Sequence, residues 1–170
     1  MTNQEILAMV DHTLLKADAK KEDIKKICEE ALENNTASIC INPGFIEYAV
    51  GILGDKIPVC TVIGFPLGAN TKEVKGFEAL DAVNKGAEEI DMVINIGALK
   101  DKKYDYVYEE IKYIKECCKT VEVSLRQLNT ECTIKSVICF GLRLLYPKKQ
   151  IYMDQSINCI CLTKNCYSKN

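Results

Sequence analysis

The sequence has no long apolar segment, no basic N-terminal region and little excess of one charge. No apolar run in its 170 residues approaches the ~18–20 residues that a membrane-spanning helix needs, so we expect no membrane association. The first five residues, MTNQE, carry none of the positive charge that opens a signal peptide, which makes the cytoplasm the expected compartment. A formal net charge of −2 argues against nucleic acid as a partner.

Histidine is almost absent as well: the sequence has one histidine, His12, and ten cysteines. The cysteines that resemble metal ligands at first sight are Cys159, Cys161 and Cys166. Their spacing matches no usual zinc pattern, and nothing indicates the secreted chain that a disulfide framework requires. Cys28, Cys40 and Cys60 fall at apolar positions of an expected helix and strands, where free cysteine behaves as a small hydrophobe. We therefore expect neither a metal nor a cofactor.

Strand-like and helix-like segments alternate over the first 123 residues. The expected strands are residues 9–15, 37–41, 59–64, 90–96 and a fifth that opens at residue 121. The expected helices are residues 24–32, 45–53, 70–85 and one with an apolar stripe formed by Val107, Ile111, Ile114 and Cys118. Asn70 is the expected N-cap of the third helix, and Gly86 its terminating residue. Strands separated by helices at this spacing predict parallel β/α units.

Two α/β architectures fit such units, a doubly wound sheet and a (β/α)8 barrel. A doubly wound nucleotide-binding sheet favours a Gly-x-Gly-x-x-Gly turn after its first strand, but here that strand is followed by Lys16, Ala17 and Asp18. This difference favours the TIM barrel. A barrel takes about 250 residues, so the chain predicts an incomplete one with about five β/α units.

The composition changes abruptly near residue 123. Residues 1–123 contain 15 Lys or Arg against 22 Asp or Glu, whereas residues 124–170 contain 7 against 2. Eight of the nine glycines precede the change, and half of the cysteines follow it. We therefore divide the chain into the N-terminal part of a barrel, residues 5–123, and an unrelated tail, residues 124–170, to which the β/α pattern does not extend.

Asp91 is the most informative residue because it lies inside an apolar strand. Its neighbours Ile90 and Met92 to Ile94 are apolar without a break. A buried carboxylate costs several kcal/mol unless it is paired or hydrogen-bonded. Asp91, which we place near the end of its strand, is therefore either a structural hydrogen-bonding group or a catalytic one.

Four motifs in order resemble the deoxyribose-phosphate aldolase family over roughly residues 5–123. The motifs are residues 11–15 (DHTLL), 40–43 (CINP), 59–68 (VCTVIGFPLG) and 89–95 (EIDMVIN). The resemblance implies a class I aldolase on a TIM barrel. Such an enzyme reversibly cleaves 2-deoxy-D-ribose 5-phosphate to acetaldehyde and D-glyceraldehyde 3-phosphate through a lysine Schiff base, without a metal.

The resemblance also implies roles for individual residues. Asp91 matches the aspartate that donates and accepts protons, as a carboxylate in a partly dry pocket can. Asp11 and Thr13, which we place at the end of strand one, resemble residues that line the substrate pocket, although a turn or cap would also explain them. Cys40 matches a cysteine near the substrate, and it also suits a strand core. His12 we interpret as structural. The implied partner is a small sugar phosphate, and the oligomeric state is open, a homo-oligomer included.

The tail departs from the family. In the family, the Schiff-base lysine lies on strand six in a Lys-Thr-Ser-Thr-Gly-Phe setting, which this sequence lacks. The tail lysines are Lys135, Lys148, Lys149, Lys164 and Lys169, none of them in a matching context. A reading-frame change near Val123 would account for the loss. We therefore expect an inactive chain, with two alternatives: a non-enzymatic remnant, or a small doubly wound domain that binds phosphate or a nucleotide.

Overall fold

The computed structural model describes residues 2–118, 122–126, 152–153 and 160–161. The helices are α1 (Asn3–Leu7), α2 (Lys21–Asn34), the 3-10 turn η1 (Pro43–Phe45), α3 (Ile46–Leu53), α4 (Lys72–Asn84), α5 (Ile96–Lys100) and α6 (Tyr104–Cys117). The strands are β1 (Asp11–Leu14), β2 (Ser38–Ile41), β3 (Val59–Ile63), β4 (Glu89–Val93), β5 (Glu122–Arg126), β6 (Tyr152–Met153) and β7 (Ile160–Cys161).

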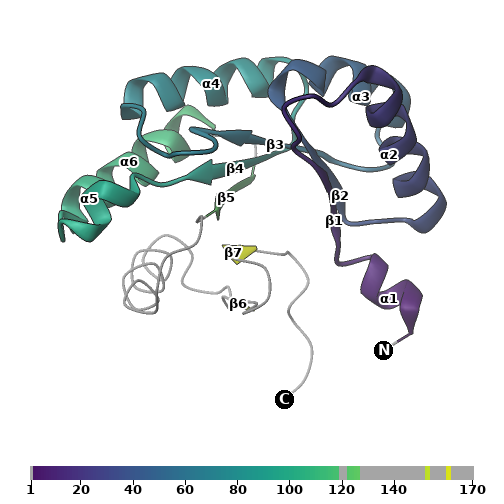
Figure 1. The fold of residues 1–170 in the computed structure, drawn as a ribbon, viewed down its shortest axis with the longest axis horizontal. Coiled ribbons are helices and arrows are strands. Elements are labelled where there is room, and N and C mark those ends of the chain that lie inside the picture. The colour runs from purple at the N-terminus through teal and green to yellow at the C-terminus, as the bar shows by residue number, and fades with distance from the viewer. Residues whose placement is uncertain (1, 119–121, 127–151, 154–159, 162–170) are drawn as a thin grey trace.

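The first five strands form one parallel sheet in the order β1-β2-β3-β4-β5. Helices α2, α3, α4 and α6 lie on one side of this sheet (Figure 1). A doubly wound sheet reverses its strand order and has helices on both faces. A sheet that advances by one strand per unit, with its helices on one side, is instead an arc of a TIM barrel. The described part of the chain therefore has the incomplete barrel that the sequence predicts, and the doubly wound alternative is wrong.

The main hydrophobic core lies between the sheet and these helices. Alternate strand residues contribute Ile39, Ile41, Val59, Ile63, Ile90 and Met92. Helix α2 contributes the stripe Ile24, Ile27, Cys28 and Ala31, which confirms the periodicity read from the sequence. Burying one such aliphatic side chain contributes about 1.5–3 kcal/mol. Strands β2 and β3 are buried on both faces, as barrel strands are.

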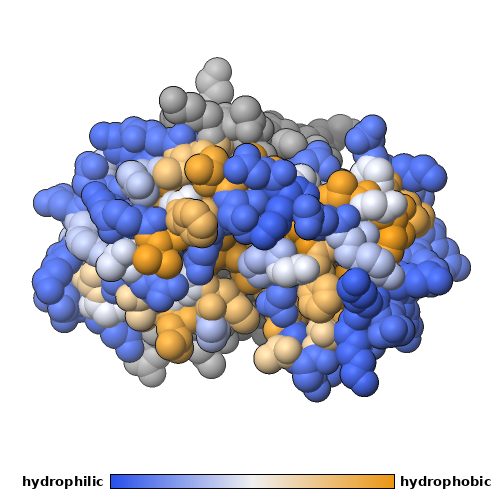
Figure 2. Space-filling view, turned by 90° about the horizontal axis from the view of Figure 1, so that it is seen from above, coloured by the Kyte–Doolittle hydropathy of each residue, from blue (hydrophilic) through white to orange (hydrophobic). Residues whose placement is uncertain are grey.

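Helix α4 has apolar side chains on its outer surface as well. Val74, Phe77 and Leu80 are exposed there, and Leu67 is exposed in the preceding loop. Figure 2, seen from the helix side, shows apolar patches among hydrophilic side chains on this face of the molecule. Because α4 is apolar on two sides, the buried stripe is difficult to recognise in its sequence.

Several element boundaries differ from the sequence prediction. Strand β1 begins only at Asp11, because the amides of Met9 and Val10 still donate to the carbonyls of Ile6 and Leu7 at the end of α1. Helix α4 is capped by Thr71, so the prediction of Asn70 is wrong.

Other boundaries agree with the prediction or are explained by a cap. Gly86, at φ +98°, occupies the predicted position after the last helical residues of α4. Strand β4 ends at Val93 rather than at residue 96, because the side chain of Asn95 accepts a hydrogen bond from the Ala98 amide and begins α5.

A buried ion pair joins α4 to α6. Lys75 Nζ lies 2.7 Å from Glu110 Oε1, and both side chains are fully buried. Lys75 Nζ also donates to the carbonyls of Gly68 and Val93, each at 2.8 Å, while Glu110 Oε2 accepts from the Asn95 amide at 3.0 Å. This network therefore holds the segments that follow β3 and β4, at the carboxyl ends of the strands.

Among the described residues, no helix combines the length and the apolar composition that crossing a membrane requires.

Candidate functional site

The inner face of the sheet, opposite the helices, carries a second and smaller buried cluster. It consists of Cys40, Cys60 and Val62, with Leu15 and Phe65 packed against it. Cys40 is paired in register with Cys60, and Val62 with Asp91. Because side chains alternate along a strand, Asp91 points to the same face as the two cysteines.

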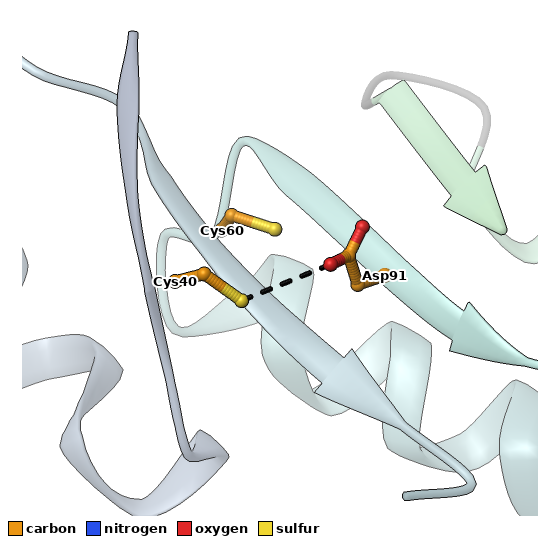
Figure 3. A group of neighbouring side chains, drawn as sticks. All are labelled: Cys40, Cys60 and Asp91. Carbon is orange, nitrogen blue, oxygen red and sulfur yellow. Dashed lines mark hydrogen bonds between the residues drawn. The ribbon is translucent and has the colours of Figure 1, made fainter. Parts of the chain in front are cut away.

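The two thiols and the carboxylate lie close together. Figure 3 shows them directed toward one another from β2, β3 and β4, and Cys40 Sγ donates a hydrogen bond to Asp91 Oδ2 at 3.8 Å. All three side chains are buried, with Asp91 only 4% exposed. A carboxylate in such a partly dry site is suited to proton transfer, and the catalytic role of Asp91 stays a prediction.

Cys60 is held in its protonated form. The hydrogen bond with Cys40, followed by burial and the nearby charge of Asp91, raises the pKa of Cys60 well above its ordinary value. A thiol is a poor nucleophile compared with its thiolate. At neutral pH Cys60 is therefore not a preformed nucleophile.

Asp91 lies in the middle of its strand, which corrects the expectation that it lies near the strand end. It is the third residue of β4 (Glu89–Val93). The strand includes Glu89, which pairs with Cys60, and its pairing extends past Asp91, to Met92 with β3 and to Val93 with β5. Cys40, by contrast, is the last but one residue of β2.

The structure places Asp11 away from the predicted end of strand one. Asp11 is the first residue of β1, and its carboxylate accepts a hydrogen bond from Ser38 Oγ at 2.8 Å. Thr13 is exposed, its hydroxyl donates to the Asp11 carbonyl at 2.8 Å, and it pairs in register with Cys40. Thr13 is therefore beside the cluster, whereas Asp11 is displaced toward the opposite end of the sheet. Their role in a substrate pocket stays a prediction.

His12 belongs to the outer side of the sheet, where it faces α2. Its Nε2 lies 2.8 Å from Glu30 Oε2, and this hydrogen bond lowers the pKa of Glu30. A cavity of about 440 Å³ lies here, with Thr13, Lys16 and Lys26 among its lining residues. The residues that line it include Thr13 but not Cys40, Cys60 or Asp91.

Lys75 is fully buried, and its contacts make it unsuitable as a nucleophile. Its three donors are used by Glu110, Gly68 and Val93. Burial lowers the pKa of Lys75, and the carboxylate of Glu110 opposes that shift. An amine that is held as an ammonium by three acceptors has no free lone pair for attack on a carbonyl.

Comparison with known proteins gives the family directly. The model of the DeoC/LacD family aldolases matches residues 5–126. The chain belongs to the DeoC/LacD aldolase family. The match covers all of the described parallel sheet, including the inner-face cluster.

Individual relatives agree with this family assignment. A deoxyribose-phosphate aldolase of Clostridium perfringens is 59% identical over 115 residues, which are 67% of this chain and 51% of the relative. One from Lysinibacillus sphaericus is 55% identical over 117 residues, which are 68% of this chain and 52% of the relative. The chain thus spans about half the length of the curated relatives it matches.

Solved structures of known and candidate deoxyribose-phosphate aldolases have the same fold. A candidate deoxyribose-phosphate aldolase from Coccidioides immitis superposes with a TM-score of 0.80 at 30% identity, covering 86% of this chain and 59% of that one. The deoxyribose phosphate aldolase from Aeropyrum pernix gives a TM-score of 0.73 at 24% identity, over 84% of this chain and 61% of that one. The second likeness supports the barrel fold alone.

Three residues of interest are not singled out by the sequence patterns. The apolar setting of Cys60 predicts only a core residue, although Cys60 occupies the same face as Cys40 and Asp91. No motif identifies Lys75 or Glu110. The available signal was their position on buried helix stripes, since Lys75 precedes Ala79 by one turn and Glu110 follows Val107 by three residues.

Proposed function

We propose that this chain carries the proton-transfer half of a deoxyribose-phosphate aldolase site. In this proposal Asp91 donates and accepts the protons of the acetaldehyde unit, and Cys40 and Thr13 line the pocket. Asp11 supports the wall of the same pocket through its hydrogen bond with Ser38. The substrate class is a small sugar phosphate, and the reaction is reversible carbon–carbon bond cleavage.

One observation carries the proposal. Asp91 is a carboxylate that is 4% exposed, on the inner face of a barrel sheet, 3.8 Å from Cys40 Sγ. A purely structural aspartate would serve as well at the rim, where water solvates it. Burying the Asp91 carboxylate inside the barrel costs desolvation free energy. Proton exchange with a bound substrate is a functional reason for a carboxylate at this position.

We further propose that the chain does not complete the reaction. Class I cleavage needs an amine that forms an iminium with the substrate carbonyl, because the iminium withdraws electrons from the bond that breaks. No lysine among the 170 residues lies in the sequence setting that the family uses for this amine. Lys75, the buried lysine of the described region, is engaged by three acceptors. Asp91 can move protons, but it cannot replace the iminium.

The test is trapping of the covalent intermediate. The purified chain is incubated with acetaldehyde and borohydride, which reduces an imine to a stable ethyl-lysine, and each peptide is mapped by mass spectrometry. We expect no adduct concentrated on one lysine and no cleavage of deoxyribose 5-phosphate. The Clostridium perfringens aldolase, treated in parallel, is the positive control.

Further outcomes test the missing Schiff-base lysine and the proton-transfer role of Asp91 separately. A stoichiometric adduct on one tail lysine, with turnover abolished by Asp91→Asn, would show that residues 124–170 rebuild the site. If the proposal holds, reversing the reading-frame change near codon 123 should restore the family's C-terminal half and create an adduct on its Schiff-base lysine. In that restored chain, Asp91→Asn should lower turnover roughly 10²–10⁴-fold. Unchanged turnover there would remove Asp91 from the mechanism.

A further inference from the structure

Three side chains with metal-ligating atoms converge on the inner face of the sheet. Cys40, Cys60 and Asp91 come from the adjacent strands β2, β3 and β4, and their ligand atoms all lie within 4.8 Å of one another. Figure 3 shows the two sulfur atoms and the carboxylate turned toward a common point. The three groups are therefore gathered by the fold itself, without the help of a loop.

The parallel register explains why the three groups meet. Cys40 and Cys60 are direct neighbours across β2 and β3, so their side chains project from the same point along the two strands. Asp91 is opposite Val62, two residues beyond Cys60 on the same face. A longer carboxylate side chain from this diagonal position can reach the thiols, as the 3.8 Å contact with Cys40 shows.

The spacing agrees with that of a tetrahedral metal site. Zinc binds thiolate at about 2.3 Å and carboxylate oxygen at about 2.0–2.2 Å, which places two ligand atoms of one tetrahedron about 3.5–3.8 Å apart. The distance between Cys40 Sγ and Asp91 Oδ2 is 3.8 Å. All three ligand atoms lie within 4.8 Å of one another. Side-chain rotations that bring the wider pairs up to about 1 Å closer complete the tetrahedral spacing.

We propose that Cys40, Cys60 and Asp91 bind one thiophilic d10 cation of the Zn²⁺ or Cd²⁺ type. Sulfur ligands select such ions over Mg²⁺ and Ca²⁺, which prefer all-oxygen sites. The ion forms bonds to two sulfurs and one carboxylate oxygen, and the two thiol protons leave to solvent. Three protein ligands leave the fourth tetrahedral position to water.

Metal binding is a property beyond the proposed aldolase function, whereas its effect on catalysis rests on that function. Binding of the cation needs only the geometry of the cluster. The consequence rests on the proposed function, because an ion that occupies the carboxylate of Asp91 prevents it from exchanging protons with a substrate. The site is accordingly inhibitory rather than catalytic.

Cadmium titration of the full chain tests the proposal. The five cysteines after residue 124 are first replaced by serine, so that they do not compete for the ion. This chain with five serine replacements is the parent for all variants. It is titrated with Cd²⁺ while the sulfur-to-cadmium charge-transfer absorbance and the metal bound at dialysis equilibrium are measured. We expect one tightly bound Cd²⁺ per chain, with the absorbance of two thiolate ligands.

Variants distinguish the two kinds of ligand. Cys60→Ser should weaken binding at least roughly tenfold and remove about half of the absorbance, since even outer-shell changes cost 10–100-fold in affinity. Asp91→Asn should weaken binding while the thiolate absorbance at saturation is retained. Cys28→Ser and Cys118→Ser, which remove equally buried thiols from the helix-covered core, should change neither quantity.

The same data can overturn the site. Equal binding by the parent and Cys60→Ser would do so, as would a chain that has a β/α circular dichroism spectrum but takes up no Cd²⁺. Cys60→Ala is the second variant if Cys60→Ser does not fold. None of these measurements depends on turnover, so failure of the aldolase proposal and failure of the metal site are separately visible.

Discussion

Replacing Glu110 by glutamine is expected to destabilise the chain by about 3–5 kcal/mol, which is the usual cost of removing one partner of a buried ion pair. Glu110 and Lys75 are both fully buried, 2.7 Å apart. The amide keeps the shape of the side chain but removes the carboxylate that is hydrogen-bonded to the Lys75 ammonium. Its NH₂ group also opposes the Asn95 amide, which now donates to Glu110 Oε2. Urea unfolding followed by circular dichroism measures the loss.

Two control substitutions separate the buried charge from packing and from ordinary ion pairing. The double variant Lys75→Met with Glu110→Leu removes both charges, and it should be less destabilised than the sum of its two single variants. Glu29→Gln breaks the exposed pair with Lys25, 3.7 Å apart, and should change stability by no more than about 0.5 kcal/mol. Additive single and double variants would contradict a coupled pair.

The fold was largely accessible from the sequence because two periodicities are strong in it. The stripe of α2 and the apolar runs of β2 and β3 identify buried faces, and the order of the β/α units then limits the topology. Strand ends were less accessible. They depend on single hydrogen bonds, such as those that keep Met9 and Val10 attached to α1 or that turn Asn95 into a cap. No periodicity carries that information.

The candidate site was accessible only in part. A carboxylate within an apolar strand singles out Asp91, and the motif order identifies Cys40. Cys60 contributes to the same cluster through the register between β2 and β3, which sequence periodicity does not give. The predictions for the tail lysines fall outside the described residues, and the assignment of residues 124–170 as unrelated to the family stays a prediction.

Substituting Gly68 by alanine should be the most damaging single change in the loop after β3. Gly68 has φ +65°, a left-handed conformation that alanine adopts only with strain. A Cβ built there clashes with the Ile94 carbonyl oxygen and lies 2.9 Å from its carbon, so the backbone itself must move. Movement also draws the Gly68 carbonyl away from Lys75 Nζ, which it now meets at 2.8 Å. We expect a loss of about 3 kcal/mol or more in urea unfolding, strain and clash combined.

Two other glycines in the chain provide matched controls for this Gly68→Ala variant. Gly54 also has a positive φ, +54°, but an added Cβ would meet nothing within 4 Å, so Gly54→Ala isolates strain and should cost about 1–3 kcal/mol. Gly51 lies inside α3 with open space around it, and Gly51→Ala should stabilise the chain by up to about 1 kcal/mol through helix propensity. If Gly68→Ala is no worse than Gly54→Ala, the close approach of Ile94 to Gly68 does not constrain the loop. A clearly larger loss shows that this contact fixes the segments after β3 and β4 beside the inner-face cluster.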